Sequence, residues 1–337
     1  MTWDLIGHQW AAQLLAHQIA AGTARHAYLF SGPPHVGRKS MALQFARAIN
    51  CPSPIRPGIP CGECRSCKLI AKLQHPDISI IESAHEGAEL KVDAIREVQS
   101  SLVLSPYEAK YRIAFLFRFH EATISAQNAL LKTLEEAPEK VILLLTSDGG
   151  DLLLPTIVSR CEQVNLRPVS SEEIMDGLQR RYSIPVNEAR FLAQVSLGRP
   201  GYAVNYHLNP DLLKKREEFL NDLWDLFGQT RRVRFSYAES KTKTSGYEDR
   251  ESLRDSLRLM FQTWQIFWRD VMVRTAQAGA ALTNPDQESR INHVAGRVSL
   301  SFAQNMVSLL EKSQSRLREA NFQLLLEAVL LEQPRFV

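Results

Sequence analysis

The stretch that decides the fold is AYLFSGPPHVGRKSMALQFARAI, residues 27–49. It begins with a short apolar run, passes through a turn rich in Gly and Pro, and continues from about Arg38 with apolar residues at helical spacing. A strand, a glycine loop and a helix in this order are typical of a P-loop, in which backbone N–H groups and a helix N-terminus face a phosphate. Gly32 and Gly37 have the separation of the motif G-x-x-x-x-G-K-S/T. We therefore predict P-loop ancestry, ahead of a strand–turn–helix that binds nothing.

The side chains of this loop depart from the motif. Arg38 and Lys39 stand where the motif has Lys and then Ser or Thr. The motif's Lys gives a compact charge to the phosphates and its hydroxyl ligates Mg²⁺, whereas Arg is larger and Lys39 cannot ligate a cation. Lys39-Ser40 would restore the pair only in a loop with one extra residue. The predicted nucleotide-binding residues are Gly32, Gly37, Arg38, Lys39 and Ser40, in a degenerate loop where ATP binding stays open and hydrolysis is not expected.

The composition narrows the class of protein without selecting one. The 337 residues are enough for about two or three domains. Lys and Arg number 40 against 37 Asp and Glu, and the net charge of +3 permits contact with nucleic acid without arguing for it. The N-terminus lacks a basic segment followed by an apolar core, and no apolar run approaches the ~18 residues of a membrane span. We therefore expect a cytoplasmic protein that does not contact a membrane.

Four of the five cysteines lie in one short segment, as Cys51, Cys61, Cys64 and Cys67. The two Cys-x-x-Cys spacings allow neighbouring sulfurs to bind the same ion, and four thiolates suit tetrahedral Zn²⁺. Four reduced thiols without a metal are the weaker interpretation. The pattern offers no open ligand position and no general base, so we predict a structural zinc site rather than a catalytic one.

The second apolar strand, RIAFLF at 112–117, also lacks the residues of an ATPase. In a P-loop ATPase this strand ends in Asp-Glu, which hold Mg²⁺ and orient the attacking water. Phe117 and Arg118 stand at that place, and the nearest carboxylate, Glu121, comes several residues later. Both halves of the Mg²⁺ site are therefore missing or altered, and we expect no intrinsic ATPase activity.

Strands alternate with helices across 26–166, which predicts a parallel sheet in α/β layers. From Pro168 the composition turns helical, and Ser170 with Glu173 forms a capping box. Asn209-Pro210 is a candidate junction. We predict a P-loop α/β domain at 1–166 with an inserted zinc module at 51–67, a small helical domain at 167–208, and a C-terminal helical domain at 209–337.

Further helices are expected at 4–25, 212–227, 253–276 and 299–331, with a basic polar segment at 230–249. In the first of them, Leu14, Leu15, Ile19 and Ala20 form the expected buried side. The stripe Leu257, Phe261, Trp264 and Trp268 predicts the core of a helix bundle rather than a cofactor or base-stacking surface. The run Arg231, Arg232 and Arg234 is interpreted as a solvated set of charges.

Several longer motifs together resemble bacterial clamp-loader ATPase-like subunits, a clade of AAA+ proteins. They are HAYLFSGP at 26–33, the cysteine quartet, VDAIREV at 92–98, NALLKTLEEAP at 128–138 and LLPTIVSRC at 153–161. Within that group, the altered Mg²⁺ residues are similar to those of the delta-prime subunits of the DNA polymerase III clamp loader. The match is dense over 1–166 and looser at 196–204 and 320–331.

The resemblance implies an AAA+-type P-loop domain, a small helical lid and an all-α C-terminal collar that assembles a ring, with a zinc module on the four cysteines. It also implies that Arg160, in Ser159-Arg160-Cys161, is an arginine finger that reaches ATP on a neighbouring motor subunit. A guanidinium supplied in trans neutralises charge on the transferred phosphoryl group. A lone arginine here would be read as a salt-bridged residue. Arg199 is a weaker candidate for a lid arginine that senses nucleotide, and Lys132 for a phosphate contact with DNA.

The principal hypothesis is a non-catalytic subunit of the DNA polymerase III holoenzyme, a DNA-directed DNA polymerase. It would help an ATP-driven ring load the sliding clamp onto primed DNA. The implied partners are motor subunits and a delta subunit in a hetero-oligomeric ring, and the clamp and primer-template DNA through that complex. The alternatives are a catalytically active motor subunit that uses Lys39-Ser40, and a zinc-bearing nucleic-acid-binding protein on an old P-loop scaffold.

Overall fold

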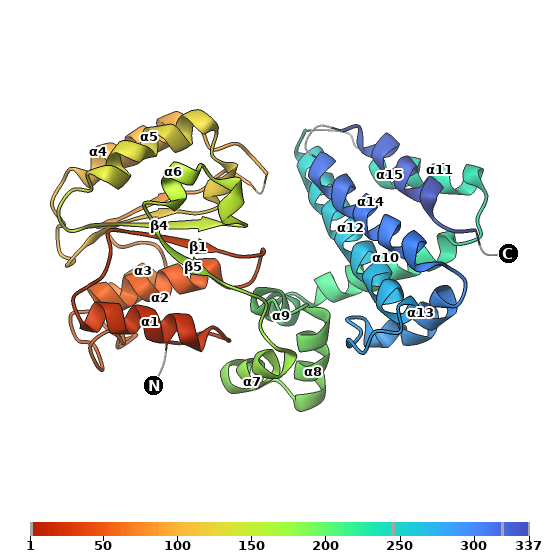
Figure 1. Cartoon of the computed structure of the whole chain (residues 1–337), viewed down its shortest axis with the longest axis horizontal. Coiled ribbons are helices and arrows are strands. Elements are labelled where there is room, and N and C mark those ends of the chain that lie inside the picture. The colour runs from red at the N-terminus through yellow and green to blue at the C-terminus, as the bar shows by residue number, and fades with distance from the viewer. Residues whose placement is uncertain (1–2, 86, 244–246, 318–319, 336–337) are drawn as a thin grey trace. The chain divides into compact units, whose positions relative to one another are not determined.

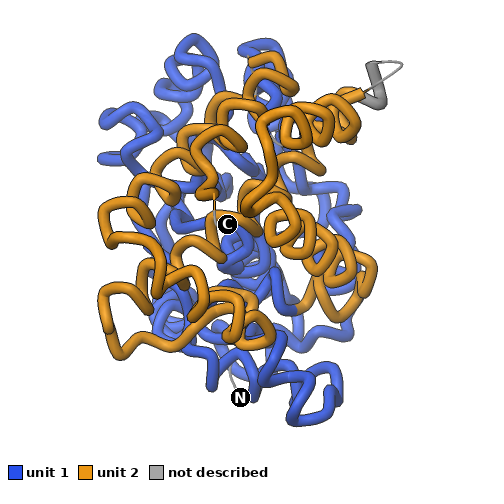
Figure 2. Tube along the Cα trace, turned by 90° about the vertical axis from the view of Figure 1, so that its right-hand side faces the viewer, with its two compact units in different colours: residues 1–193, 198–203 blue, residues 194–197, 204–337 orange. Residues whose placement is uncertain are grey.

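The computed structural model describes residues 3–85, 87–243, 247–317 and 320–335 (Figure 1). The chain divides into two compact units, Met1–Ala193 with Gly198–Ala203, and Gln194–Leu197 with Val204–Val337 (Figure 2). The three-part division at 166 and 208 stays a prediction. No helix among the described residues is long and apolar enough to cross a membrane.

Unit 1 is built on a parallel five-stranded sheet with the strand order β2-β3-β4-β1-β5. The strands are β1 (Ala27–Ser31), β2 (Ile78–Ile81), β3 (Arg112–Leu116), β4 (Val141–Ser147) and β5 (Glu162–Asn165). In the register of the central pair, Leu29 of β1 lies beside Leu145 of β4. Strands β1, β3 and β4 are buried along their whole length, as expected of a sheet covered on both faces. The predicted parallel α/β sheet is therefore confirmed.

Helices cover the two faces of this sheet as separate layers, which Figure 1 shows. One layer holds α1 (Gln9–Ala20), α2 (Arg38–Asn50) and α3 (Arg65–Ala71), and the other holds α4 (Val92–Leu102), α5 (Ile124–Glu135) and α6 (Pro155–Val158). Short 3₁₀ turns lie at η1 (Phe119–Glu121) and η2 (Gly150–Leu152). Because strand residues alternate between faces, Tyr28 and Phe30 join the core under α2, while Leu29 joins the core under α5.

The helix predicted at 4–25 is shorter than expected. It runs from Gln9 to Ala20, because Gly7 and His8 before it both have positive φ angles that interrupt a helix. Its buried residues are Ala11, Ala12 and Leu15. Leu15 is buried as predicted, whereas Leu14 and Ala20 are exposed, so the predicted buried side was wrong in part.

The segment after the sheet begins with α7 (Ser171–Tyr182), whose N-terminus has the predicted capping box. The Ser170 hydroxyl accepts a hydrogen bond from the Glu173 N–H at 3.2 Å, and the Glu173 carboxylate accepts one from the Ser170 N–H. Helices α8 (Val186–Val195) and α9 (Pro200–Leu208) follow. Gly177 of α7 packs directly on Ile6, where an added Cβ would lie 2.6 Å from the Ile6 side chain.

Unit 2 is helical in its described residues. Its helices are α10 (Pro210–Leu226), α11 (Arg231–Thr242), α12 (Tyr247–Thr275), α13 (Glu288–Ala295), α14 (Leu300–Arg316) and α15 (Phe322–Glu332), with the 3₁₀ turn η3 (Pro285–Gln287) before α13. The stripe from Leu257 to Trp268 lies in the core of this bundle, as predicted. Two predictions were wrong: the segment 230–249 contains α11, and the region 299–331 holds two helices rather than one.

Arg234 is not part of a solvated run of charges, although Arg231 and Arg232 are exposed. Its side chain is buried and donates hydrogen bonds to the carbonyl oxygens of Leu330, Gln333 and Pro334. These carbonyls lie at the C-terminus of α15, where the last C=O groups of a helix lack partners within the helix. A buried cation therefore caps α15 from α11, which the local sequence does not reveal.

Candidate functional site

The predicted P-loop joins the central strand β1 to helix α2 through residues 32–37. Gly32 and Gly37 have φ angles of 142° and 117°, and an added Cβ on Gly32 would lie 2.1 Å from the Leu166 carbonyl oxygen. Glycine is thus required at both ends of the loop. Because α2 begins directly after Gly37, Arg38 stands at the motif's Lys position and no extra residue separates them. Lys39 and Ser40, both exposed, follow on the first turn of the helix.

A short segment of the helical region closes over the middle of this loop. The Gly201 N–H donates to the His35 carbonyl oxygen at 2.8 Å, and the rings of His35 and Tyr202 lie 4.1 Å apart. The Arg199 guanidinium lies over the Tyr202 ring at 4.4 Å. Burial, followed by the charges of Arg199 and Arg38, lowers the pKa of His35. Arg199 therefore lies near the loop, beside an aromatic ring.

The two cations of the loop are paired with carboxylates of the same chain. Arg38 lies 2.5 Å from the Asp148 carboxylate, just after β4. The Lys39 ammonium donates to Glu82, just after β2, at 3.0 Å, and also lies 4.3 Å from the Phe117 ring centre. The groups that would bind phosphates in an ATPase are thus neutralised from within the protein.

Arg118 lies just after β3, where an ATPase carries its Mg²⁺ carboxylates, and its guanidinium contacts several acceptors at once. Its guanidinium donates to Glu82 at 2.9 Å, to Glu121 at 3.0 Å and to the Ser83 carbonyl oxygen at 2.8 Å. Its backbone has a φ of 48°, which is uncommon outside glycine. Lys39, Glu82, Arg118 and Glu121 therefore form one continuous chain of ion pairs.

Glu121 is held in its charged form by this network. Burial alone would raise its pKa, but hydrogen bonds from the Ser83 hydroxyl and the Gly87 N–H, with the charge of Arg118, lower the pKa below the ordinary value. The Gly87 N–H lies 2.6 Å from Glu121 Oε1. Both carboxylate oxygens of Glu121 thus accept hydrogen bonds from the protein rather than contact a metal ion.

Arg160 lies at the surface, just after α6. Its guanidinium contacts the Glu135 carboxylate at 2.6 Å and donates to the Thr156 carbonyl oxygen at 3.0 Å. The side chains of Arg160 and Glu135 are 36% and 49% exposed. The neighbouring Cys161 is buried, and burial raises its pKa to about 12, which makes it a packed thiol.

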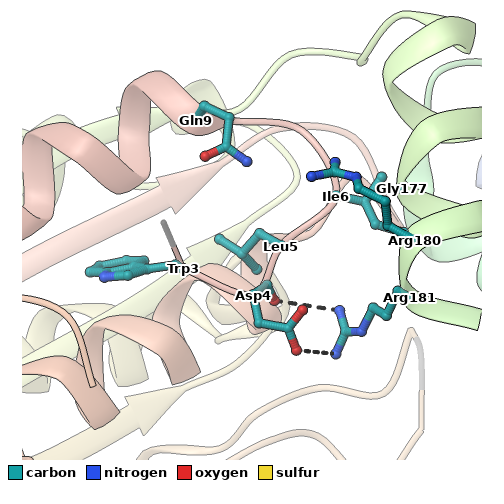
Figure 3. A pocket seen from close by; sticks show the side chains of 8 residues that line it. All are labelled: Trp3, Asp4, Leu5, Ile6, Gln9, Gly177, Arg180 and Arg181. Atoms are coloured by element: carbon teal, nitrogen blue, oxygen red, sulfur yellow. Dashed lines mark hydrogen bonds and ion pairs between the residues drawn. The ribbon is translucent and has the colours of Figure 1, made fainter. Parts of the chain in front are cut away.

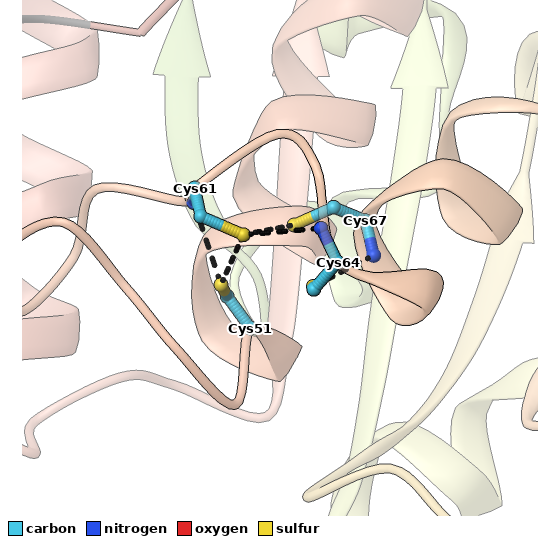
Figure 4. Close-up of side chains that lie close together, drawn as sticks. All are labelled: Cys51, Cys61, Cys64 and Cys67. Atoms are coloured by element: carbon cyan, nitrogen blue, oxygen red, sulfur yellow. Dashed lines mark hydrogen bonds between the residues drawn. The ribbon is translucent and has the colours of Figure 1, made fainter.

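The four cysteines converge between the end of α2 and the start of α3 (Figure 4). Their sulfur atoms all lie within 4.8 Å of one another, with Cys61 3.5 Å from Cys51 and 4.0 Å from Cys67. Tetrahedral Zn–S bonds of about 2.3 Å would separate the sulfurs by roughly 3.8 Å. The donor set and its spacing therefore fit a bound metal ion.

The surroundings of the cysteines shift their pKa values in opposite directions. The N–H groups of Cys64 and Glu63 lower the pKa of Cys61 to about 6, whereas burial raises the pKa of Cys67 to about 12. The Cys67 N–H also donates to the Cys64 sulfur at 3.4 Å. Metal binding would release the remaining thiol protons, as expected of a site that is completed by its ion.

An open cavity of about 410 Å³ lies between the N-terminal segment and α7 (Figure 3). Arg181 on its rim forms an ion pair with Asp4 at 3.1 Å, and the Gln9 side chain lines the same space. Within the described part of the chain, none of the residues predicted to form a site lines this cavity.

The sequence interpretation missed the carboxylates that complete these arrangements: Glu82, Asp148 and Glu135. A signal was available for the first two, because each lies at the end of an apolar run, and in the structure each directly follows a strand, β2 or β4. The carboxyl ends of parallel strands meet at one edge of a sheet, which is also the edge of the P-loop. For Glu135 the sequence held no such signal.

The fold and this edge of the sheet define an α/β P-loop protein with additional helices, as predicted. Residues 7–170 match the family model described as "DNA polymerase III, delta subunit". Over part of its length the chain is similar to the delta′, tau and gamma subunits of bacterial DNA polymerase III, which confirms the resemblance seen in its motifs.

Individual relatives give the extent of this similarity. The chain is 30% identical to the delta′ subunit of Haemophilus influenzae over 212 residues, 62% of this chain and 64% of that protein. It is 33% identical to the tau subunit of Bacillus subtilis over 178 residues, 52% of this chain but 31% of that protein. A solved gamma subunit-related protein of Thermotoga maritima covers 96% of this chain and 98% of its own, at 18% identity and a TM-score of 0.48. The chain thus spans about a third of the length of the tau relative.

Proposed function

We propose that this protein is a non-catalytic clamp-loader subunit that donates Arg160 to the ATP site of a neighbouring motor subunit. The relationship to DNA polymerase III subunits supports the clamp-loader role. The proposed partners are motor subunits and a delta subunit in a hetero-oligomeric ring, with the sliding clamp and primer-template DNA reached through that complex. The proposed site of action is the cytoplasm.

The observation that carries the non-catalytic assignment is the internal pairing of the loop's cations. Phosphate binding would require Arg38 to leave Asp148 and Lys39 to leave Glu82. It would also bring phosphate charge next to those two carboxylates, which disfavours the complex. Arg118 adds a third obstacle, because a guanidinium repels the Mg²⁺ that hydrolysis needs.

Arg160 differs from these residues because its guanidinium is accessible. Arg carries five N–H donors in a rigid fork, and Glu135 and Thr156 each contact one of its two terminal nitrogens. Phosphate oxygens on another subunit would find a cation that neutralises developing charge, which is the role of an arginine finger. This supports the assignment of Arg160 to catalysis in trans.

The ion proposed for the cysteine cluster is Zn²⁺, in a structural role. Four sulfur ligands close the tetrahedral shell and leave no position for water or substrate, so the ion would serve folding rather than chemistry. Cys51 directly follows α2 and Cys67 lies on α3, so the ion would fix α3 against the P-loop helix. Native purification followed by elemental analysis should give about one zinc ion per chain.

The test is steady-state ATPase in the presence of primed DNA and clamp. The chain is assayed alone and after reconstitution with its motor subunits, as wild type, as Arg160→Ala and as Arg96→Ala. Arg96 is a matched control, because it is an exposed arginine of the same unit that pairs with Asp93. We expect a silent chain that accelerates the motor, with the acceleration lost in Arg160→Ala by about 10³-fold or more and kept in Arg96→Ala.

Each of three outcomes would overturn all or part of the proposal. Turnover by the chain alone, carried by Lys39-Ser40, would make it a motor subunit. Full acceleration by Arg160→Ala would remove the finger while leaving the clamp-loader role in place. Tight binding of primed DNA by the isolated chain would favour the third class, a zinc-bearing nucleic-acid-binding protein.

A further inference from the structure

Glu135 occupies a position that helix stability does not explain. It is the last residue of α5, where the helix dipole disfavours a negative side chain. Its partner is Arg160, at 2.6 Å on the turn after α6. The favourable contact of the Glu135 carboxylate is therefore with Arg160, the arginine that is proposed to act on another subunit.

The two contacts of Arg160 hold its guanidinium against its own chain. Glu135 holds one terminal nitrogen, and the Thr156 carbonyl oxygen, four residues earlier, holds the other at 3.0 Å. In this conformation the side chain folds back along α6. To reach a phosphate on another subunit, the guanidinium must exchange the Glu135 carboxylate for phosphate oxygens.

We propose that Glu135 is a latch that keeps Arg160 on its own subunit and opens when a neighbour's nucleotide phosphates take its place. The inference rests on the proposed finger role of Arg160 and adds its regulation. Ion pairs this exposed contribute little to stability, so phosphates of higher charge displace the carboxylate readily. Glu135 is thus a positioning residue: it lowers the occupancy of the extended finger when no nucleotide is bound next door.

The chain supplies a matched control in the adjacent Glu136, which is also exposed and belongs to the same sequence motif. Glu135→Gln removes the charge that holds Arg160 and keeps the size of the side chain. Glu136→Gln makes the same chemical change one residue later. Because the two variants alter net charge equally, long-range electrostatic effects cancel in the comparison.

The first measurement uses the isolated chain and probes the latch without any partner. The rate at which phenylglyoxal modifies Arg160 is followed by mass spectrometry of the peptide that contains it. Release of an exposed ion pair should raise this rate about two- to five-fold in Glu135→Gln, with Glu136→Gln equal to wild type. Equal rates in all three proteins would overturn the latch.

The second measurement uses the complex reconstituted with motor subunits, primed DNA and clamp. We expect Glu135→Gln to lower the KM for ATP about two- to five-fold with kcat unchanged, because only the competition before phosphate contact is removed. A higher KM, a lower kcat, or behaviour identical to Glu136→Gln would overturn the inference. A merely structural role would not give this split.

Arg160→Ala in the same assay separates the two proposals. If it abolishes the acceleration while Glu135→Gln and Glu136→Gln match wild type, the finger stands and the latch fails. If it leaves the acceleration intact, the finger itself fails.

Discussion

Arg38 and Arg160 are both arginines paired with a carboxylate of the same chain, yet their surroundings differ. Arg38 lies in the P-loop with its side chain 10% exposed and its partner Asp148 31% exposed. Arg160 and Glu135 are 36% and 49% exposed. A second network, from Lys39 through Glu82 to Arg118 and on to Glu121, continues from the residue after Arg38, whereas the pair at Arg160 stands on a surface turn.

The comparison shows that the burial of an ion pair determines how much free energy is needed to break it. Breaking a desolvated pair leaves a charge without water or a partner, at a cost of about 3–5 kcal/mol. An exposed pair is replaced by water at about 0–1 kcal/mol. In the proposed function, the same chemistry occupies the cations of the P-loop and leaves Arg160 available to another subunit.

The variant with the largest expected effect tests whether the fold around Arg38 depends on the metal module at 51–67. Cys67→Ser should abolish metal binding and the hydrogen-exchange protection of α3, because structural zinc contributes roughly 10 kcal/mol or more to its module. The protection of β1 should remain. Cys161→Ser, at a buried thiol outside the cluster, should retain the metal. Loss of protection throughout unit 1 would mean that the P-loop pairs rely on the ion.

Arg118→Ala tests the comparison at the buried carboxylate of Glu121. It leaves Glu121 buried beside Ser83 and Gly87 without its cation, and should lower the free energy of unfolding of unit 1 by about 3 kcal/mol. Urea titration read through hydrogen exchange of β3 reports this unit separately. A loss below about 1 kcal/mol would place Arg118 with surface pairs and break the comparison.

The pH dependence of stability tests the same network. Because the folded protein holds the pKa of Glu121 below its ordinary value of 4.5, the carboxylate stabilises the fold above about pH 4.5. That contribution should disappear as the pH falls through the lower pKa of the folded state. Urea midpoints between pH 6 and pH 3 should therefore decline more steeply for wild type than for Glu121→Gln. Parallel curves would show that Glu121 is not held in its charged form.

The smallest effect is expected on the exposed side. Arg160→Ala should change the free energy of unfolding by less than about 1 kcal/mol, since water replaces an exposed partner. Arg38→Ala, measured in the same urea titration, should cost more. If the two variants lose the same free energy of unfolding, exposure does not distinguish the two ion pairs. The proposal that the Arg160 pair is released more easily than the Arg38 pair then fails.

Local pattern was sufficient for the elements that position the site. The helix after the glycine loop begins at Arg38, as expected, because the second glycine and the apolar spacing fix its start. The capping box at Ser170 formed as predicted, since its two hydrogen bonds join residues three apart. The cysteines converge because two of their spacings are short enough for neighbouring sulfurs to meet.

Prediction was wrong where a distant partner overrides local character. Arg234 reads as one of several surface charges, but α15 brings three carbonyl oxygens to it from nearly a hundred residues away. Leu14 reads as buried, but the residues of α1 that the fold buries are Ala11, Ala12 and Leu15. For Arg234 the deciding contact lies outside the window that a periodicity can sense.

By itself, the sequence determined that the chain carries a P-loop with the wrong side chains, a four-cysteine cluster and an arginine at the end of a conspicuous motif. Only the tertiary structure decided what those side chains contact. Lys39 meets Glu82 across 43 residues because a parallel sheet gathers the carboxyl ends of its strands at one edge. Arg160 meets Glu135 because α5 and α6 pack on the same face. The sequence shows which residues are charged. The fold determines which partner each charge has and how deeply it is buried, and burial determines the strength of the ion pair.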